Sequence, residues 1–468
     1  MNRTERAVLA SPAGLLAGRQ LGDWQPEDRA FWSQAGAGIA RRNLVFSILA
    51  EHVGFSVWSL WSAFVLFLTP AYGISPDPRT AAAEKFLLTT LPTAVGAGLR
   101  VPYTLAVARF GGRNWTCISA ALLLVPTVAA AIALRPGVSY RTLLLLATLA
   151  GLGGGNFASS MANINSFYPQ RLKGRVLGLN AGGGNIGVAV VQLAGLAVLA
   201  TAGKAHPRVL LGIYIPLVVL ATLGAALFMD NLPHVRNAKG ATRSACRDPH
   251  TWFVSVLYIG TFGSFIGYSF AFGQVLADQF GAHFLSHGRP DPVKVACLTF
   301  LGPLIGSLIR PAGGWLADRI GGALASAWNF AAMAAAAAVV LVASQQRSLA
   351  LFYVGFIGLF ALSGVGNGSV YKMIPAVFAA KAERAVAAGA DAEPARHESR
   401  RLANTVIGLA AAVGAFGGVL VNLAFRQSFL SYGTGDVAYL GFIAFYVACL
   451  ALTWIVYLRP SPRRLTGI

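Results

Sequence analysis

Apolar residues occur along this chain in long blocks that short polar segments separate. A helix needs about 20 mostly apolar residues to cross the hydrocarbon core of a membrane. Only helices satisfy every backbone polar group within single apolar blocks of this kind. The pattern therefore predicts an all-α polytopic membrane protein with twelve transmembrane helices. The expected spans are 44–68, 86–108, 115–134, 142–166, 175–201, 208–229, 252–277, 293–316, 322–344, 348–378, 402–424 and 438–458.

Composition agrees with this class and suggests an order of domains. Of the 468 residues 56% are hydrophobic and 12% are charged, whereas soluble domains carry about 25% charged residues. The first 43 residues are polar and lack the short apolar core and cleavage site of a signal peptide. We therefore expect a cytoplasmic lead-in at 1–43, a six-helix bundle at 44–229, a cytoplasmic linker at 230–250, a second six-helix bundle at 251–458 and a cytoplasmic tail at 459–468.

The formal net charge of +20 follows the loops and does not indicate nucleic acid binding. Lysine and arginine gather in alternate loops, and the loops between them carry fewer. Under the positive-inside rule this distribution places both termini in the cytoplasm, in agreement with an even number of spans. The basic loops also attract anionic membrane lipids. Examples are Arg41, Arg42, Arg171, Lys173, Arg175, Lys381, Arg400 and Arg401.

Residues for catalysis or metal binding do not cluster in the sequence. The cysteines are far apart and lack the spacing of metal ligands. The apolar blocks contain no group of His, Cys and Asp, and no phosphate-binding loop precedes them. We therefore expect no enzymatic activity, no metal and no cofactor. The four cysteines are Cys117, Cys246, Cys297 and Cys449.

An internal repeat at an offset of 210 residues divides the chain. Residues 91–112 read LPTAVGAGLRVPYTLAVARFGG, and residues 301–322 read LGPLIGSLIRPAGGWLADRIGG. The internal glycine, both arginines and the closing Gly-Gly coincide. Two related six-helix halves of this kind are a transporter plan with its substrate site at the interface of the halves.

The repeat places Arg100 and Arg310 at equivalent positions, each about halfway along its span. An arginine at the centre of a membrane costs about 2.5–3.5 kcal/mol even on the lenient insertion scale. The two guanidinium groups can face one another and clamp an anion, because arginine stays charged and offers planar, bidentate donors. Nitrate, nitrite, phosphate and a carboxylate are candidate ligands. A purely structural alternative is that the arginines bond to backbone carbonyls or cap broken helices.

The neighbouring spans favour a flat, weakly hydrated, monovalent anion. They carry aromatic rings, amides and hydroxyls but no further fixed positive charge. Taken singly, each aromatic ring is more often a packing residue than a ligand contact. The set comprises Phe157, Tyr258, Phe262 and Tyr268, the amides Asn156, Asn163, Asn180 and Asn185, and the hydroxyls of Ser159, Ser160 and Thr261.

Two kinds of motif carry a resemblance to known families. The segment GGWLADRIGG resembles the loop 2–3 motif of the major facilitator superfamily, with Asp318 and Arg319 in it and Arg109 in its counterpart AVARFGGR. In that counterpart Ala108 replaces the aspartate. Nearly the whole chain is similar to the nitrate/nitrite porter family within this superfamily. The motifs are DWQPEDRAFW, GGNFASSMANINSFYP, LYIGTFGSFIGYS, GVGNGSVYKMIP and the two nitrate signatures GLNAGGGNIGV and IGLAAAVGAFGG.

This resemblance implies a major facilitator fold and a site for nitrate and nitrite. It implies that Arg100 and Arg310 clamp the anion and that Phe157 and Tyr258 form the walls of its pocket. It adds Phe262 and Asn185 to the pocket. It implies a monomer in the bacterial inner membrane. Asn180, Gly408 and Ala411 are further candidate contacts, and Ala181 and Ala411 stand where the family often has glycine or another small residue.

Charge balance during transport depends on whether a titratable group accompanies the anion. Glu51 and His52 lie about two turns inside the first span, where a carboxylate is expensive unless it is protonated or paired. If Glu51 takes a proton when nitrate binds, the protein is a nitrate/proton symporter, and charge balance favours this mode. Nitrate/nitrite exchange is the alternative, with Glu51 paired to a loop arginine such as Arg171 or Arg175. Another small monovalent oxyanion or a carboxylate is the alternative substrate.

Overall fold

The computed structural model describes residues 20–22, 24–232, 240–460, 465 and 468. The first 19 residues of the predicted lead-in lie outside the described residues. So do residues 233–239 of the predicted linker and residues 461–464 and 466–467 of the predicted tail. The predicted domain boundaries stay predictions.

The first half of the chain is helical with short connections. A one-turn helix and a π-helical turn lead into the first long helix. The elements are α2 (Arg29–Phe31), η1 (Trp32–Gly36), α3 (Ala37–Trp58), α4 (Leu60–Phe64), η2 (Pro70–Tyr72), α5 (Pro78–Phe110), α6 (Gly112–Leu122), α7 (Leu124–Ala133), α8 (Tyr140–Ala150), η3 (Gly151–Gly155), α9 (Asn156–Phe167), α10 (Gln170–Thr201) and α11 (Arg208–Phe228).

The second half repeats this order and adds one small hairpin. Its elements are α12 (Ala241–Arg247), α13 (Pro249–Tyr258), η4 (Ile259–Gly263), α14 (Ser264–Gln279), η5 (Gly281–His283), β1 (Leu285–Ser286), β2 (Arg289–Pro290), α15 (Pro292–Thr299), α16 (Leu301–Leu308), α17 (Arg310–Ile320), α18 (Gly322–Gln345), α19 (Leu349–Ala387), α20 (Ala392–Tyr432), α21 (Asp436–Thr453) and η6 (Trp454–Leu458). The strands β1 and β2 pair antiparallel.

All twelve predicted spans are occupied by helices, but several helices extend beyond the apolar blocks. The helix α3 begins at Ala37, seven residues before the expected span, and α4 continues it after a break at Ser59. The helices α19 and α20 run 39 and 41 residues, because a helix can continue into water beyond the apolar layer. Among the described residues, ten helical spans are long and apolar enough by themselves to cross a membrane; α5, which contains Arg100, is not among them.

The helix ends confirm the sequence repeat. Both α5 and α17 end at a glycine with positive φ, Gly111 at 85° and Gly321 at 88°. Glycine adopts this conformation without the penalty that a Cβ atom brings. The two glycines are 210 residues apart. The repeated Gly-Gly is therefore a helix stop followed at once by the next helix.

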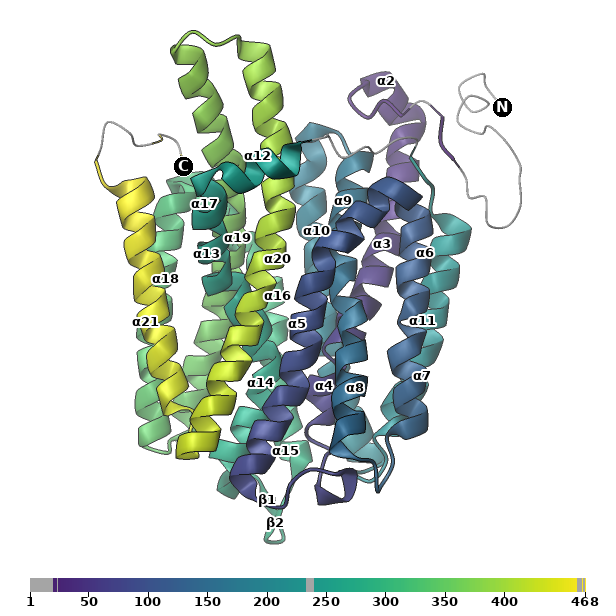
Figure 1. Ribbon diagram of the computed structural model, residues 1–468, viewed down its shortest axis with the longest axis vertical. Helices are drawn as coiled ribbons and strands as arrows, with labels where there is room; N and C mark the ends of the chain where they lie inside the picture. The colour runs from purple at the N-terminus through teal and green to yellow at the C-terminus, as the bar shows by residue number, and fades with distance from the viewer. Residues whose placement is uncertain (1–19, 23, 233–239, 461–464, 466–467) are drawn as a thin grey trace.

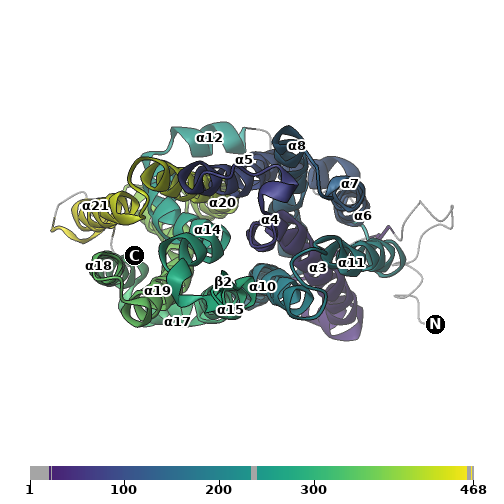
Figure 2. The ribbon, with the colours of Figure 1, turned by 90° about the horizontal axis from the view of Figure 1, so that it is seen from below.

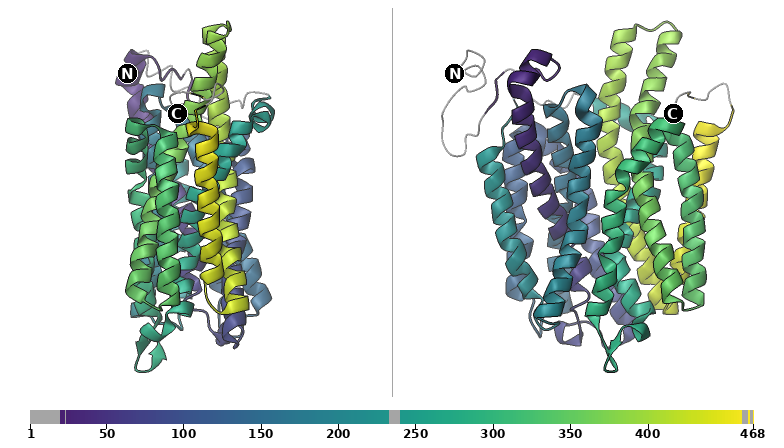
Figure 3. Two further views of the ribbon diagram at one scale, coloured as in Figure 1. Left: turned by 90° about the vertical axis from the view of Figure 1, so that its left-hand side faces the viewer. Right: turned by 180° about the vertical axis from the view of Figure 1, so that it is seen from behind.

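The helices form two bundles that stand side by side (Figures 1 and 2). The first helix α2, the helix α12 and the last residue, Ile468, lie at one end of the molecule, which we call the terminal end. The α19–α20 connection extends beyond the bundles at this end (Figures 1 and 3). The β1–β2 hairpin marks the opposite end, which we call the hairpin end. Since α2 and Ile468 lie at the same end, the number of crossings between them is even, as expected.

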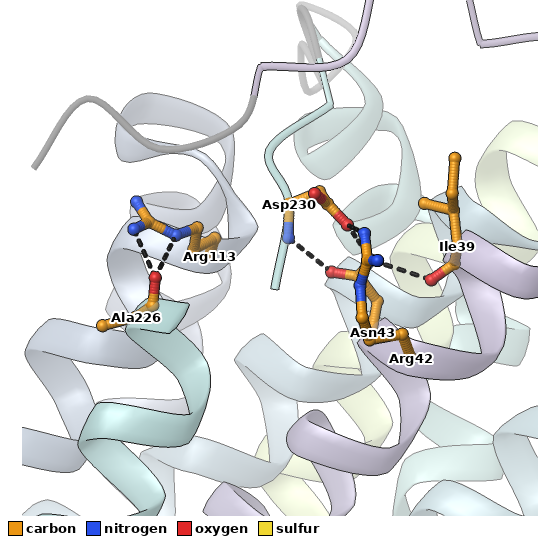
Figure 4. A network of polar contacts seen from close by, with 6 residues as sticks. All are labelled: Ile39, Arg42, Asn43, Arg113, Ala226 and Asp230. Atoms are coloured by element: carbon orange, nitrogen blue, oxygen red, sulfur yellow. Dashed lines mark hydrogen bonds and ion pairs between the residues drawn. The ribbon is translucent and has the colours of Figure 1, made fainter. Parts of the chain in front are cut away.

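The start of the linker is anchored to the first bundle at the terminal end. The buried carboxylate of Asp230 accepts hydrogen bonds from Arg42 Nη2 at 2.7 Å and Asn43 Nδ2 at 2.8 Å (Figure 4). The backbone N–H of Asp230 donates to Asn43 Oδ1 at 2.8 Å. Nearby, Arg113 Nε donates to the carbonyl of Ala226 at 3.1 Å. These bonds fix the end of α11 against α3 and α6.

Candidate functional site

Close backbone packing places each central arginine in its bundle. A Cβ atom on Gly154 would lie 2.5 Å from Gly96 Cα, and Gly96 stands one helical turn before Arg100. In the second bundle a Cβ atom on Gly306, one turn before Arg310, would lie 2.9 Å from the carbonyl oxygen of Phe360. Small residues let helices approach this closely in lipid. Each arginine stands ten residues before the last residue of its helix.

Arg100 is fully buried among aromatic rings. The centre of its guanidinium lies 4.7 Å from the ring centroid of Phe157, 4.9 Å from that of Phe262 and 5.6 Å from that of Trp58. Such contacts are worth about 2 kcal/mol or more when they are desolvated. Arg100 Nη1 donates to the carbonyl of Ala411 at 2.9 Å. One nitrogen of Arg100 therefore bonds to a backbone carbonyl, as the purely structural alternative proposed. The other two, Nε and Nη2, have no hydrogen-bond partner.

Arg310 is joined to Arg100 through a short row of stacked rings. Its Nη2 donates to the hydroxyl of Tyr258 at 3.1 Å. The rings of Tyr258 and Phe262 are stacked at 5.2 Å with an interplanar angle of 6°, and Phe262 contacts Arg100. Arg310 Nη1 has no hydrogen-bond partner. Both arginines therefore keep donors for a ligand and share one aromatic wall.

The predicted walls come together from both bundles. The rings of Phe157 and Phe262 face each other at 6.0 Å and 28°. Phe157 belongs to α9 of the first bundle. In the second bundle Tyr258 is the last residue of α13, and Phe262 belongs to η4. All three side chains are buried. The fourth predicted aromatic residue, Tyr268, instead hydrogen-bonds with Tyr446 inside the second bundle.

The two amides of the first nitrate signature have different environments. Asn185 is buried, and neither its Oδ1 nor its Nδ2 has a hydrogen-bond partner. A buried amide without partners costs about 1–3 kcal/mol, so Asn185 is a strong candidate for a ligand contact. Asn180 Nδ2 instead donates to Glu51 Oε2 and to Ser160 Oγ, both at 2.8 Å. Asn180 is thus tied to the carboxylate of α3.

Glu51 packs against α10, within electrostatic range of the central arginines. It is buried, its Oε1 has no hydrogen-bond partner, and it interacts electrostatically with Arg100 and Arg310. Arg171 and Arg175 are exposed, and the structure gives no ion pair between either of them and Glu51 within the part of the chain that it describes. The suggested pairing of Glu51 with a loop arginine is therefore wrong.

His52 and the glycines of α10 form a tight contact between α3 and α10. The Nδ1 atom of His52 lies 3.1 Å from the carbonyl oxygen of Gly183. A Cβ atom on Gly184 or on Gly187 would overlap the Glu51 side chain or the His52 carbonyl. These glycines let α10 approach α3 closely, which brings Asn180 to Glu51.

The second nitrate signature, IGLAAAVGAFGG, contributes backbone atoms to the site. The carbonyl of Ala411 accepts the bond from Arg100. A Cβ atom on Gly414 would lie 2.5 Å from the ring of Tyr258, and one on Gly417 would lie 2.7 Å from Gly263 Cα. Gly408 has open space beside it, and the structure gives it no contact with the arginines. Its role in binding stays a prediction.

Two residues of the site do not belong to the predicted set. Trp58 contacts Arg100, and the ring centroid of Tyr371 lies 5.5 Å from the guanidinium of Arg310. The hydroxyl of Tyr371 is buried without a partner. Trp58 stands two turns after Glu51 on α3, and Tyr371 lies in the motif GVGNGSVYKMIP. Trp58 could have been predicted from the sequence, because helical periodicity places it on the same face of α3 as Glu51. Tyr371 could not, because its contact with Arg310 depends on how α19 packs against α17.

The loop motif lies at the terminal end, away from the arginines. Lys372 Nζ donates to Asp318 Oδ1 at 2.7 Å, which links α19 to α17. The guanidinium of Arg319 lies 3.9 Å from the ring centroid of Trp315. Arg109 contacts its neighbour Phe110 at 5.6 Å. Each of these contacts joins residues of the same bundle, as expected if the motif has a packing role.

The bundles also touch between the arginines and the hairpin end. Gln192 Nε2 donates to the carbonyl of Ser269 at 2.8 Å, and Thr89 Oγ1 donates to Asn422 Oδ1 at 2.8 Å. The ring of Phe86 packs on phenylalanines of α20. The helix α10 of the first bundle packs on α15 and α16 of the second. These two helices form the hairpin-end part of the span that contains Arg310. This half of the interface is closed by polar and aromatic contacts.

Comparison with known proteins agrees with this architecture. The family model of the Major Facilitator Superfamily matches residues 48–421. The nitrate/nitrite transporter NarU of Salmonella typhimurium is 37% identical over 465 residues, which cover 95% of this chain and 97% of the relative. The "Probable nitrate/nitrite antiporter NarK2" of Thermus thermophilus is 32% identical and covers 96% and 98% of the two chains. The chain belongs to the nitrate/nitrite porter family of the major facilitator superfamily.

Solved structures of other transporters share the fold of this porter. A D-xylose–proton symporter superposes with a TM-score of 0.66 at 13% identity, covering 89% of this chain and 97% of the symporter. A bacterial homologue of the lysosomal transporter Spinster gives a TM-score of 0.61 at 14% identity and covers 90% and 98%. At these identities the likeness shows the fold alone. The family and these neighbours are transporters.

Proposed function

We propose that this porter carries nitrate and nitrite across the bacterial inner membrane, with the anion held between Arg100 and Arg310. The observation that carries the proposal is the state of the two guanidinium groups. They are buried, related by the sequence repeat and connected through one row of rings, and three of their nitrogens lack a hydrogen-bond partner. The names of the full-length relatives supply the substrates.

The chemistry of the site supports a flat monovalent oxyanion. Planar guanidinium groups can donate two parallel hydrogen bonds to two oxygens of nitrate or nitrite. The faces of Phe157 and Phe262 offer no hydrogen bonds, so they favour a weakly hydrated anion over phosphate. Asn185 supplies an amide without a hydrogen-bond partner. It lies between Gly184 and Gly187, the glycines through which α10 packs on α3. Another small monovalent oxyanion or a carboxylate remains the alternative substrate.

The way in which the bundles meet supports alternating access. The arginines come from different bundles, so an anion between them joins the two bodies. In the structure the contacts toward the hairpin end join the bundles. With the basic loops placing the terminal end in the cytoplasm, these contacts form the outer seal. Rocking of the bundles about the central site would break these contacts and expose the arginines to the outside.

Glu51 supports coupling to protons. Its carboxylate is buried, one oxygen lacks a partner, and it lies in the field of both arginines. In the empty state a charged Glu51 balances one arginine. When nitrate binds, protonation of Glu51 keeps the net charge of the centre unchanged. Exchange of nitrate for nitrite is the alternative, and the name of the Thermus thermophilus relative favours it.

Transport by the purified protein in liposomes tests both the substrate and the coupling. One preparation has an inward proton gradient and no internal anion, and the other has internal nitrite and no gradient. Nitrate uptake in the first supports symport. Uptake only in the second supports exchange and removes Glu51 as a proton carrier. Absence of nitrate uptake in both would refute the proposed function. The protein is expected to work as a monomer in contact with membrane lipid.

A further inference from the structure

Two glycines of α19 bring the next residue on their helix face, Tyr371, to Arg310. A Cβ atom on Gly364 would lie 2.3 Å from the carbonyl oxygen of Gly306, and one on Gly368 would lie 2.3 Å from that of Arg310. The helix backbones therefore touch at both glycines. Tyr371 follows Gly368 by three residues, so it stands about one turn further along the same face. In Figure 2, α17 and α19 lie side by side.

The ring of Tyr371 is packed in place, but its hydroxyl has no bond to the protein. The ring centroid lies 5.5 Å from the centre of the Arg310 guanidinium and 5.8 Å from the ring centroid of Tyr258. The hydroxyl oxygen is buried and has no hydrogen-bond partner. It also lies within electrostatic range of both central arginines. A buried hydroxyl without a partner is costly, so this position favours a ligand that accepts a hydrogen bond.

The unbonded donors on the two sides of the site match different oxygens of an anion. On the first bundle, Nε and Nη2 of Arg100 form one edge of the guanidinium, which can hold two oxygens side by side. Nitrite has only these two oxygens. Nitrate has a third, which points away from Arg100 when the other two are held. An anion between the arginines therefore directs its third oxygen toward the second bundle, where Arg310 Nη1 and the hydroxyl of Tyr371 are unbonded.

We propose that the hydroxyl of Tyr371 donates a hydrogen bond to the third oxygen of nitrate and so makes the site prefer nitrate over nitrite. The inference rests on the proposed function, which places the anion between Arg100 and Arg310. Nitrite leaves this hydroxyl buried and unbonded, and a site discriminates strongly against a ligand that leaves one of its buried polar groups without a partner. Arg310 discriminates less, because its charge attracts either anion.

The variant Tyr371→Phe tests this role, because it removes the hydroxyl and keeps the ring beside Arg310. Titration calorimetry on the purified protein gives the Kd for nitrate and the Kd for nitrite separately. We expect the Kd for nitrate to rise about tenfold, as for the loss of one hydrogen bond to a charged ligand. The Kd for nitrite should change by less than about twofold, because nitrite does not use the hydroxyl. Tyr268→Phe is the matched control, since the hydroxyl of Tyr268 bonds with Tyr446 inside the second bundle.

The ratio of the two Kd values separates this role from a merely structural one. A packing defect in Tyr371→Phe would raise both Kd values by the same factor, and that result overturns the proposal. An unchanged Kd for nitrate in the variant also overturns it. The unchanged protein gives a second test that needs no variant, because it must bind nitrate more tightly than nitrite; equal or tighter binding of nitrite shows that the proposal is wrong. If the unchanged protein binds neither anion, the proposed function fails as well.

Discussion

Replacement of Arg100 by lysine keeps the positive charge of the central site but removes its planar fork. In the structure Arg100 uses Nη1 to hold the carbonyl of Ala411 at 2.9 Å and leaves Nε and Nη2 for a ligand. A lysine at this position has one nitrogen for both tasks. The variant therefore loses at least one of the two hydrogen bonds that the fork can donate to an oxyanion. A hydrogen bond to a charged group contributes about 1.5–3 kcal/mol.

That loss corresponds to a Kd for nitrate that rises about tenfold to a hundredfold, because each 1.4 kcal/mol is a factor of about ten. Binding can be measured by titration calorimetry on the purified protein. It can also be followed through the fluorescence of Trp58, whose ring lies 5.6 Å from the Arg100 guanidinium. Arg310→Lys should give a loss of similar size, because Arg310 also has one donor bonded and one free.

Arg109→Lys is the matched control, since it makes the same chemical change on the same helix. Arg109 lies next to its aromatic neighbour at the terminal end and has no contact with the rings of the site. The unfolding temperature of each variant without nitrate shows whether the protein is intact. If Arg100→Lys and Arg310→Lys both bind nitrate within about threefold of the unchanged protein, the loss of one hydrogen bond estimated above has not occurred and the clamp is wrong.

Three further changes test other parts of the molecule. Asn185→Leu keeps the volume of the side chain but removes both unpaired amide atoms, so nitrate uptake should fail while the amount of protein in the membrane stays normal; normal uptake would exclude Asn185 from the site. Glu51→Gln should abolish uptake driven by a proton gradient and preserve exchange of nitrate for nitrite in liposomes, and proton-driven uptake at the original rate would refute a proton on Glu51. Arg42→Ala leaves the fully buried Asp230 without its ion pair but with the hydrogen bond from Asn43. Because the Arg42 side chain is 34% exposed, the cost should be below that of a fully buried pair, about 3–5 kcal/mol; the unfolding temperature should fall, and a milder fall is expected for Asp230→Asn because the amide carries no charge.

The fold was readable from the sequence because membrane insertion imposes a strong local rule. Each block of apolar residues must become a helix whatever its neighbours do, so all twelve spans could be placed. The repeat was equally local, since the arginine and the closing glycines recur at the same offset. What hydropathy does not mark is the helix beyond the membrane. The ends of α19 and α20 in residues 379–401 are polar and still helical, because they are rich in good helix formers.

Some residues of the site could be predicted from the sequence, and others could not. Arg100 and Arg310 stood out because an unpaired charge in an apolar span is costly. Phe157, Tyr258 and Phe262 were expected through the family resemblance, and the structure does bring them to the arginines. Partners that depend on how two helices meet were not accessible from the sequence.

By itself, the sequence determined the class of protein, the number of spans, the two related halves and the charges that lie within the membrane. These properties follow from local rules of hydropathy, charge and repetition. Only the tertiary structure decided which polar groups meet. It placed Glu51 against Asn180 and in the field of the arginines, where the sequence allowed a loop arginine instead. It also brought Gln192 to Ser269 across the bundle interface. Such meetings depend on the rotation of each helix about its axis and on the fit between helices far apart in sequence, and packing alone sets both.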